Sequence, residues 1–156
     1  MKNPLHKTGA GFTMLEIIAV LMVVAILAAM AIARGMGNDD AVAEANSLKS
    51  KLRFAQLRAM SDVVMWGVQV NSDTLVLLSD ESPATVFFPD VGSNTYDLPD
   101  GVTIIGGTAT IQFDDRGRPY TGTGISVHPL DADYTITVGG DPNVTVTITE
   151  ETGFIP

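Results

Sequence analysis

The chain has no cysteine among its 156 residues, and its basic residues are few. Without cysteine there can be no disulfide, no thiolate nucleophile and no cysteine-bound metal. Nine lysines and arginines stand against eighteen aspartates and glutamates, which gives a net charge of −9. From Asp62 onward only Arg116 and Arg118 are basic. A C-terminal region this acidic repels phosphate backbones, so unassisted nucleic-acid binding is not expected.

An apolar segment runs from Phe12 to Ala33 and contains one charged residue, Glu16. As a helix it would be roughly 33 Å long, comparable to the hydrocarbon core of a bilayer. A carboxylate in such a helix costs about 2.5–3.5 kcal/mol at the membrane centre and less near an end. Glu16 is therefore either a terminal charge that reaches the headgroups or a carboxylate that needs a positive partner.

The residues before this segment form a short basic leader that ends in Gly11. It carries Lys2 and Lys7 and no acid. A secretory signal has its small-residue cleavage site after the apolar core, whereas here the small residue precedes it. Cleavage after Gly11 would leave the apolar segment on the mature chain, with a new amine at Phe12. The basic leader predicts a cytoplasmic N-terminus and a C-terminal domain on the other side of the membrane.

The stretch Gly11-Phe12-Thr13-Met14-Leu15-Glu16 resembles the processing site of type IV pilins. The resemblance implies cleavage between Gly11 and Phe12 by a prepilin peptidase, and N-methylation of Phe12. It also implies that Glu16 docks each subunit against the amine of its neighbour. An amine and a carboxylate attract strongly in low dielectric, and either is penalised there alone. In this context the assembly role of Glu16 is favoured over a charge that merely reaches the headgroups.

A second helical pattern follows two glycines, Gly35 and Gly37, which weaken or kink a helix. These glycines mark either a linker or a soft point that can unwind in a filament. The residues after them carry one apolar stripe at helical spacing: Ala41, Ala45, Leu48, Leu52, Ala55 and Ala59. Four basic residues are expected largely off that stripe, either solvated or touching acidic neighbours in an assembly: Lys49, Lys51, Arg53 and Arg58.

From Val63 the pattern alternates with the period of β-strands, and a tight hairpin is expected at residues 71–73. Residues 84–88 are predicted as a strand and residues 89–101 as a surface loop. The predicted fold class is α+β: a long N-terminal helix with a membrane half and an amphipathic half, then a pilin-like antiparallel β-sheet domain. The predicted parts are a leader at 1–11, a transmembrane or filament-core helix at 12–34, an amphipathic helix at 35–62 and a periplasmic β domain at 63–156.

Four segments narrow the resemblance to the GspH/FimT family of minor pilins and pseudopilins: KLRFAQLRAMSDVVMWGVQV, TLVLLS, IQFDDRGRP and VTVTITEETGF. It implies a minor pseudopilin or pilin subunit of a type II secretion or type IV pilus system. The implied partners are major and minor subunits, the prepilin peptidase, the inner-membrane assembly platform and membrane lipid. The alternative is a FimT-like DNA-binding minor pilin for DNA uptake, but such members carry basic residues near the C-terminus, where this chain has Glu150 and Glu151. A third reading, a membrane-anchored periplasmic domain without a filament role, does not account for the arrangement of Gly11 and Glu16.

Enzymatic chemistry has little support in the sequence. Once the leader is removed, His128 is the only histidine left for a catalytic triad or a metal site. Ca²⁺ could bind oxygens of the short acidic stretches, but such stretches are usually only solvated: Asp97 and Asp100, Asp114 and Asp115, Asp131 and Asp133. We therefore expect a chain that is not an enzyme and that needs neither metal nor cofactor.

Overall fold

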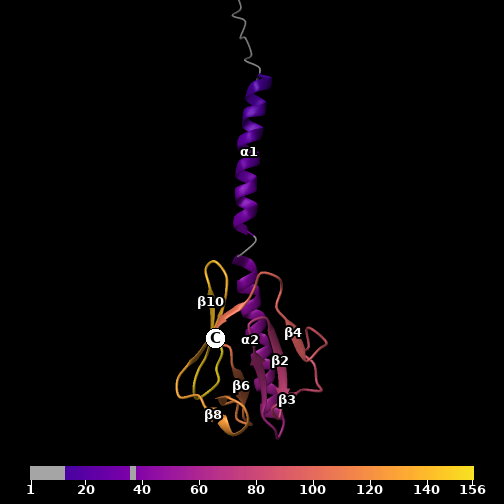
Figure 1. Cartoon of the computed structure of the whole chain (residues 1–156), viewed down its shortest axis with the longest axis vertical. Coiled ribbons are helices and arrows are strands. Elements are labelled where there is room, and N and C mark those ends of the chain that lie inside the picture. Colours follow the sequence, from indigo (N-terminus) through magenta and orange to yellow (C-terminus); the bar gives the residue numbers. More distant parts are fainter. Residues whose placement is uncertain (1–12, 36–37) are drawn as a thin grey trace, which may run out of the picture. The chain divides into compact units, whose positions relative to one another are not determined.

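The computed structural model describes the backbone of residues 13–35 and 38–156 (Figure 1). Side chains are described for residues 13–30 and 40–156. The chain divides into two compact units, residues 1–36 and residues 37–156. The cleavage-site residues Gly11 and Phe12 lie outside the described residues.

The N-terminal part contains two helices, α1 (Met14–Gly35) and α2 (Asn38–Ser61). The prediction of one long helix with a membrane half and an amphipathic half is therefore wrong. Glycine favours the end of a helix and is costly inside one, while Asn38 and the acids that follow favour a helix start. Among the helices of the described residues, none has the length and apolar character needed to cross a bilayer.

Most strands belong to an antiparallel sheet in the second unit, in the order β3-β2-β1-β6-β7-β8, with β4 also paired to β2 (Figure 1). Its strands are β1 (Trp66–Val70), β2 (Thr74–Ser79), β3 (Ser82–Pro83), β4 (Thr95–Asp97), β6 (Thr110–Phe113), β7 (Pro119–Thr121) and β8 (His128–Pro129). The expected hairpin at residues 71–73 is confirmed, because β1 and β2 pair with Val70 opposite Leu75.

A smaller antiparallel sheet has the order β10-β9-β5. It contains β5 (Ile104–Gly106), β9 (Tyr134–Val138) and β10 (Val144–Ile148). Strands β9 and β10 pair in register over five residues, with Val146 opposite Ile136. The α+β class with antiparallel strands, read from the alternating pattern, agrees with this architecture.

Helix α2 packs against both sheets through its apolar stripe. All six predicted stripe residues are buried: Ala41, Ala45, Leu48, Leu52, Ala55 and Ala59. They meet inward side chains of β1, β6, β9 and β10, among them Val68, Ile111, Ile136 and Val146. The core of the second unit therefore lies between one helix and two sheets.

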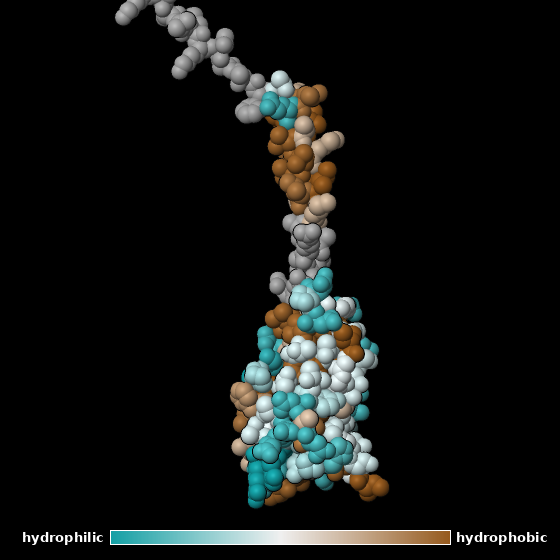
Figure 2. All heavy atoms as spheres, turned by 90° about the vertical axis from the view of Figure 1, so that its left-hand side faces the viewer, coloured by the Kyte–Doolittle hydropathy of each residue, from teal (hydrophilic) through white to brown (hydrophobic). Residues whose placement is uncertain are grey.

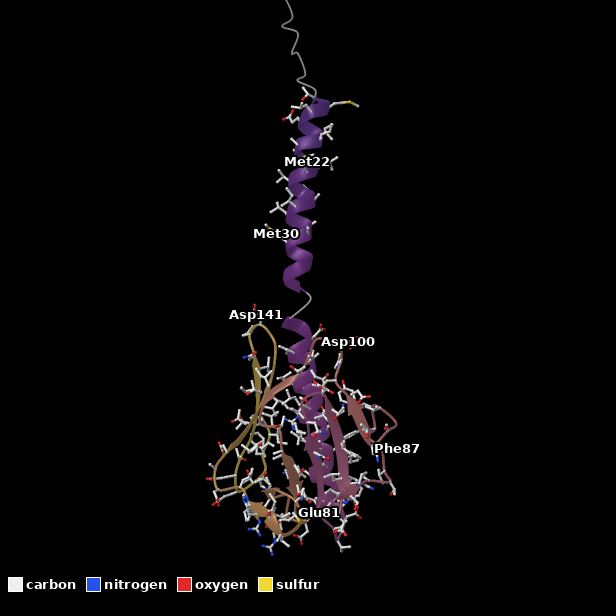
Figure 3. The ribbon with its side chains drawn as sticks, viewed as in Figure 1. Met22, Met30, Glu81, Phe87, Asp100 and Asp141 are labelled. Atoms are coloured by element: carbon white, nitrogen blue, oxygen red, sulfur yellow. The ribbon has the colours of Figure 1, made fainter. Side chains whose placement is uncertain are left out.

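The segment at residues 84–88, predicted as a strand, is irregular. The chain leaves the sheet after the short strand β3, and Phe88 turns inward to become fully buried while Phe87 stays exposed (Figure 3). Proline at positions 83 and 89 removes backbone donors on both sides of this segment. The expected surface loop at residues 89–101 holds the short strand β4, and a 3-10 turn occupies Gly124–Ser126.

Candidate assembly site

Glu16 lies in the first turn of α1, where Thr13 begins the helix. The Glu16 backbone N–H donates to the Thr13 hydroxyl at 3.3 Å and to the Thr13 carbonyl at 3.1 Å. Thr-x-x-Glu is the spacing of a capping box, which stabilises a helix start. A negative charge in the first turn is also favoured by the helix dipole. A local stabilising role thus accounts for Thr13 and for the position of Glu16.

The side chain of Glu16 is exposed, and so are all described side chains of α1. The exposed fractions of its large apolar side chains run from 50% at Ile17 to 85% at Met14. Figure 2 shows the described part of α1 as almost continuously hydrophobic on the visible face, and Met22 and Met30 project from it in Figure 3. A helix that is apolar on every side is stable in protein cores or in lipid, so α1 needs an apolar partner.

Of the four basic residues on α2, Arg53 is exposed, Lys49 and Arg58 are half-buried and Lys51 is buried, so the expected solvated face is wrong for Lys51. Lys51 is 1% exposed, and its ammonium donates to Asp90 at 2.6 Å and to the Ser47 hydroxyl at 2.8 Å. The same ammonium lies 3.7 Å from the centroid of the Tyr96 ring. With these three contacts the lysine is a buried cation that links α2 to the segment at residues 90–96.

Two further basic residues of α2 also have partners inside the domain. The Arg53 guanidinium donates to the carbonyl oxygen of Ile155. Arg58 stacks over the Trp66 ring, with its guanidinium carbon 4.9 Å from the ring centroid. Lys49 is half-buried. Arg53 and Arg58 therefore help to tie the domain together, while Arg53 stays exposed.

The polar group around Lys51 continues through the ring of Tyr96 to a buried carboxylate. The Tyr96 hydroxyl donates to Glu44 at 2.8 Å, and Glu44 is 5% exposed. Burial raises the pKa of Tyr96, and the hydrogen bond to Glu44 adds to that rise. Burial alone would raise the pKa of Asp90, but the hydrogen bond from Lys51 and its charge lower it overall.

Sequence reasoning overlooked this group, although the helical spacing contained the signal. Lys51 lies three residues after Leu48 and four before Ala55, and Glu44 lies three after Ala41 and four before Leu48. Both residues therefore belong to the apolar stripe itself rather than to the exposed face. Their partners Asp90 and Tyr96 come from a segment about forty to fifty residues away, which spacing along α2 cannot identify.

A shallow groove of about 420 Å³ runs beside Lys51. Its lining is mostly neutral and comes from α2 and the segment at Pro89: Ala43, Asn46, Ser47, Ser50, Lys51, Phe54, Pro89 and Asp90. A second depression of about 400 Å³ lies between Arg118 and the pair Glu150 and Glu151. In the first groove the Ser47 hydroxyl accepts a hydrogen bond from the Lys51 ammonium, which also donates to Asp90.

Each acidic stretch considered for Ca²⁺ has a simpler explanation or stays exposed. Asp114 accepts the backbone N–H groups of Arg116 and Arg118 at 2.9 and 2.8 Å and so closes its own turn. Asp133 accepts the Glu150 N–H at 3.1 Å. In the part of the chain that the structure describes, no three acidic, histidine or cysteine residues are grouped as metal ligands. His128 is exposed on β8, and its ring lies beside the carbonyl of Pro129.

Gly117 in the segment IQFDDRGRP and Gly153 in the segment VTVTITEETGF are both hydrogen-bonded to one side chain of α2. The Gln56 amide nitrogen donates to the carbonyls of Gly117 at 2.9 Å and Gly153 at 3.1 Å. Both glycines have positive φ, +78° and +62°. The Gln56 side chain thus holds both the turn at residues 114–118 and the C-terminal segment. These motifs therefore have a structural explanation that requires no catalytic or binding role.

Comparison with known proteins gives no family assignment. No protein-family model, curated protein or solved structure matches this chain.

Proposed function

We propose that this chain is a minor pilin or pseudopilin subunit that enters a filament of a type II secretion or type IV pilus system. The observation that carries the proposal is α1, which is exposed and apolar on all sides with Glu16 as the one charge between Thr13 and Met30. Such a helix becomes stable when equivalent helices of neighbouring subunits surround it. A buried carboxylate then needs a positive partner.

Processing supplies that partner in the proposed mechanism. Cleavage between Gly11 and Phe12 creates an amine four residues before Glu16, and the amine of one subunit pairs with the carboxylate of the next. The proposed partners are major and minor subunits, the prepilin peptidase, the inner-membrane assembly platform and membrane lipid. The second unit belongs in the periplasm, and the chain is at the inner membrane before assembly. These assignments rest on the leader and the cleavage-site resemblance.

The first test is the mature N-terminus. Intact-mass analysis of the chain, recovered from membranes of a host with the peptidase, is expected to show Phe12 as the first residue, with one added methyl group. A chain that still carries residues 1–11 would reject the proposal. A cut after the apolar segment near Ala33 would reject it as well, because the helix would then be lost.

The second test removes the carboxylate. Glu16→Ala leaves an amine unpaired at the subunit contact, a loss of about 3–5 kcal/mol for a well-buried pair. We expect normal processing and membrane level but sharply reduced co-purification with the major subunit. Asp40→Ala is the matched control, since it removes the same charge from an exposed site on α2. Undiminished co-purification of Glu16→Ala would mean that the carboxylate only caps α1.

A further inference from the structure

The outer strands of the two sheets are unequal in length. Strands β3 and β8 have two residues each, and both contain a proline, Pro83 or Pro129. Strands β4 and β5 have three residues each, and β5 pairs with β9 through an irregular register. Short strands, prolines and bulges are the devices by which proteins block unwanted strand pairing. These four strands are therefore poor templates for another chain.

Strand β10 lacks all of these devices. It has five residues, VTVTI, with no charge, proline or glycine, and its register with β9 is regular. Within the described residues it pairs with β9 alone, so its other side is an edge. An uncharged, regular, β-branched edge is the kind that accepts an added strand.

The hydrogen bonds of Thr149 identify the backbone groups on this edge. The Thr149 N–H donates to the Phe154 carbonyl, and the Thr149 carbonyl accepts the Gly153 N–H, both at 3.0 Å. These groups of Thr149 therefore point away from β9. Backbone direction alternates along a strand, so those of Thr147 and Thr145 point the same way. In the described part of the chain, no hydrogen bond satisfies these two N–H and two C=O groups.

Charge favours a different protein over a second copy as the occupant of this edge. Acidic residues flank β10 on both sides, with Asp141 in the loop before it (Figure 3) and Glu150 and Glu151 after it. An antiparallel pair of two copies centred on Val146 would bring the loop with Asp141 of each copy near the turn with Glu150 and Glu151 of the other. Acidic residues gathered at both ends of such a pair would repel one another. A partner with basic residues at these positions would instead be attracted.

We propose that β10 is a docking edge for an extended segment of another protein, with an uncharged, β-branched centre and basic ends. The segment would bond to the backbone of Thr145 and Thr147. Its side chains would alternate like those of β10, where Val146 and Ile148 are buried and Thr145 is exposed. Backbone bonds would supply the affinity, and the charged ends would select the partner. This surface is distinct from α1 and does not depend on the proposed filament role.

The test uses a fluorescent peptide, Lys-Thr-Val-Thr-Val-Thr-Lys, and the full chain in detergent micelles at low salt. Thr147→Pro removes the outward N–H, which the fold does not use, whereas Thr147→Ala retains it. We expect Thr147→Pro to bind the peptide at least about tenfold more weakly than Thr147→Ala. Equal binding by the two variants would overturn the proposal. Equal binding of a peptide with glutamate in place of lysine would also overturn it.

Two further measurements keep the test decisive if Thr147→Pro disturbs the fold. In the wild-type chain, the peptide is expected to slow amide hydrogen exchange at Thr145 and Thr147 at least about tenfold. Unchanged exchange at a saturating peptide concentration would reject the docking edge. A concentration-dependent dimer of the wild-type chain that Thr147→Pro abolishes would show that the occupant is a second copy, contrary to the proposal.

Discussion

Gly153 lies so close to Gly117 that a Cβ atom on Gly153 would be 2.5 Å from the Gly117 carbonyl oxygen. The same atom would be 2.7 Å from the Gln56 amide nitrogen that bonds to both glycines. Two segments that are 36 positions apart are therefore in close contact beside α2. Because a side chain at Gly153 would prevent this contact, we interpret both glycines as residues that the fold requires.

Gly153→Ala is expected to lower the free energy of unfolding by about 2–5 kcal/mol, from the positive φ and the steric overlap together. Gly92→Ala is the matched control because Gly92 has a similar φ of +68° and nothing within 4 Å of an added Cβ. The control should lose about 1–2 kcal/mol. Urea unfolding of both variants provides the measurement. Equal losses would contradict the close contact with Gly117.

The ion pair of Lys51 and Asp90 gives a second prediction. Asp90→Asn is expected to cost about 1–2 kcal/mol at pH 7, because a buried ammonium loses its counter-charge. The figure is modest because the Asp90 side chain is 55% exposed and water screens the pair. Asp100→Asn is the control, since Asp100 is exposed and also acidic (Figure 3). A loss no greater than that of the control would show that the pair contributes nothing.

The same pair predicts a dependence on pH. The pKa of Asp90 is lowered from its ordinary value of 3.8, so its carboxylate stabilises the folded state above that pH. This stabilisation is lost as the pH falls through the lower pKa of the folded state. The difference in unfolding free energy between wild type and Asp90→Asn should therefore shrink steadily below about pH 4. A difference that persists at pH 2 would point to packing in place of charge.

DNA binding is expected to be weak. The domain is acidic, Lys51 is buried, and Arg53 and Arg58 already have partners. Titration of the full chain in detergent with duplex DNA at low salt should show no steeply salt-dependent binding. Sub-micromolar affinity at moderate salt would support the DNA-uptake alternative. Lys49→Gln would then be the first variant to measure, because Lys49 is the least engaged of the four basic residues on α2.

The sequence predicted the secondary structure correctly where the spacing of apolar residues along the chain determines it. The stripe on α2, the hairpin at residues 71–73 and the strands β9 and β10 follow directly from spacings of three and four or of two. The prediction was wrong where contacts between residues far apart in the sequence determine the structure. At residues 84–88, burial of Phe88 overrides the strand that the sequence pattern predicts. The pairing of Lys51 with Asp90 crosses 39 positions, and no local pattern records such a contact. Of the predicted site, Glu16 is placed at a helix start, while Gly11 and Phe12 lie outside the described residues.

Because the C-terminal segment binds to α2, the fold of the second unit can be completed only after the last residues of the chain have been synthesised. Arg53 and Ile155 are 102 positions apart, and β10, which packs on the same helix, is made almost as late. Helix α2 and strand β1 therefore leave the ribosome long before β9, β10 and the C-terminal segment, which cover part of the apolar stripe. Until residues 144–155 are made, the part of the stripe that they cover is open to other exposed chains. Shielding of the nascent chain matters most in this interval, and truncations before Val144 should aggregate instead of forming a smaller stable domain.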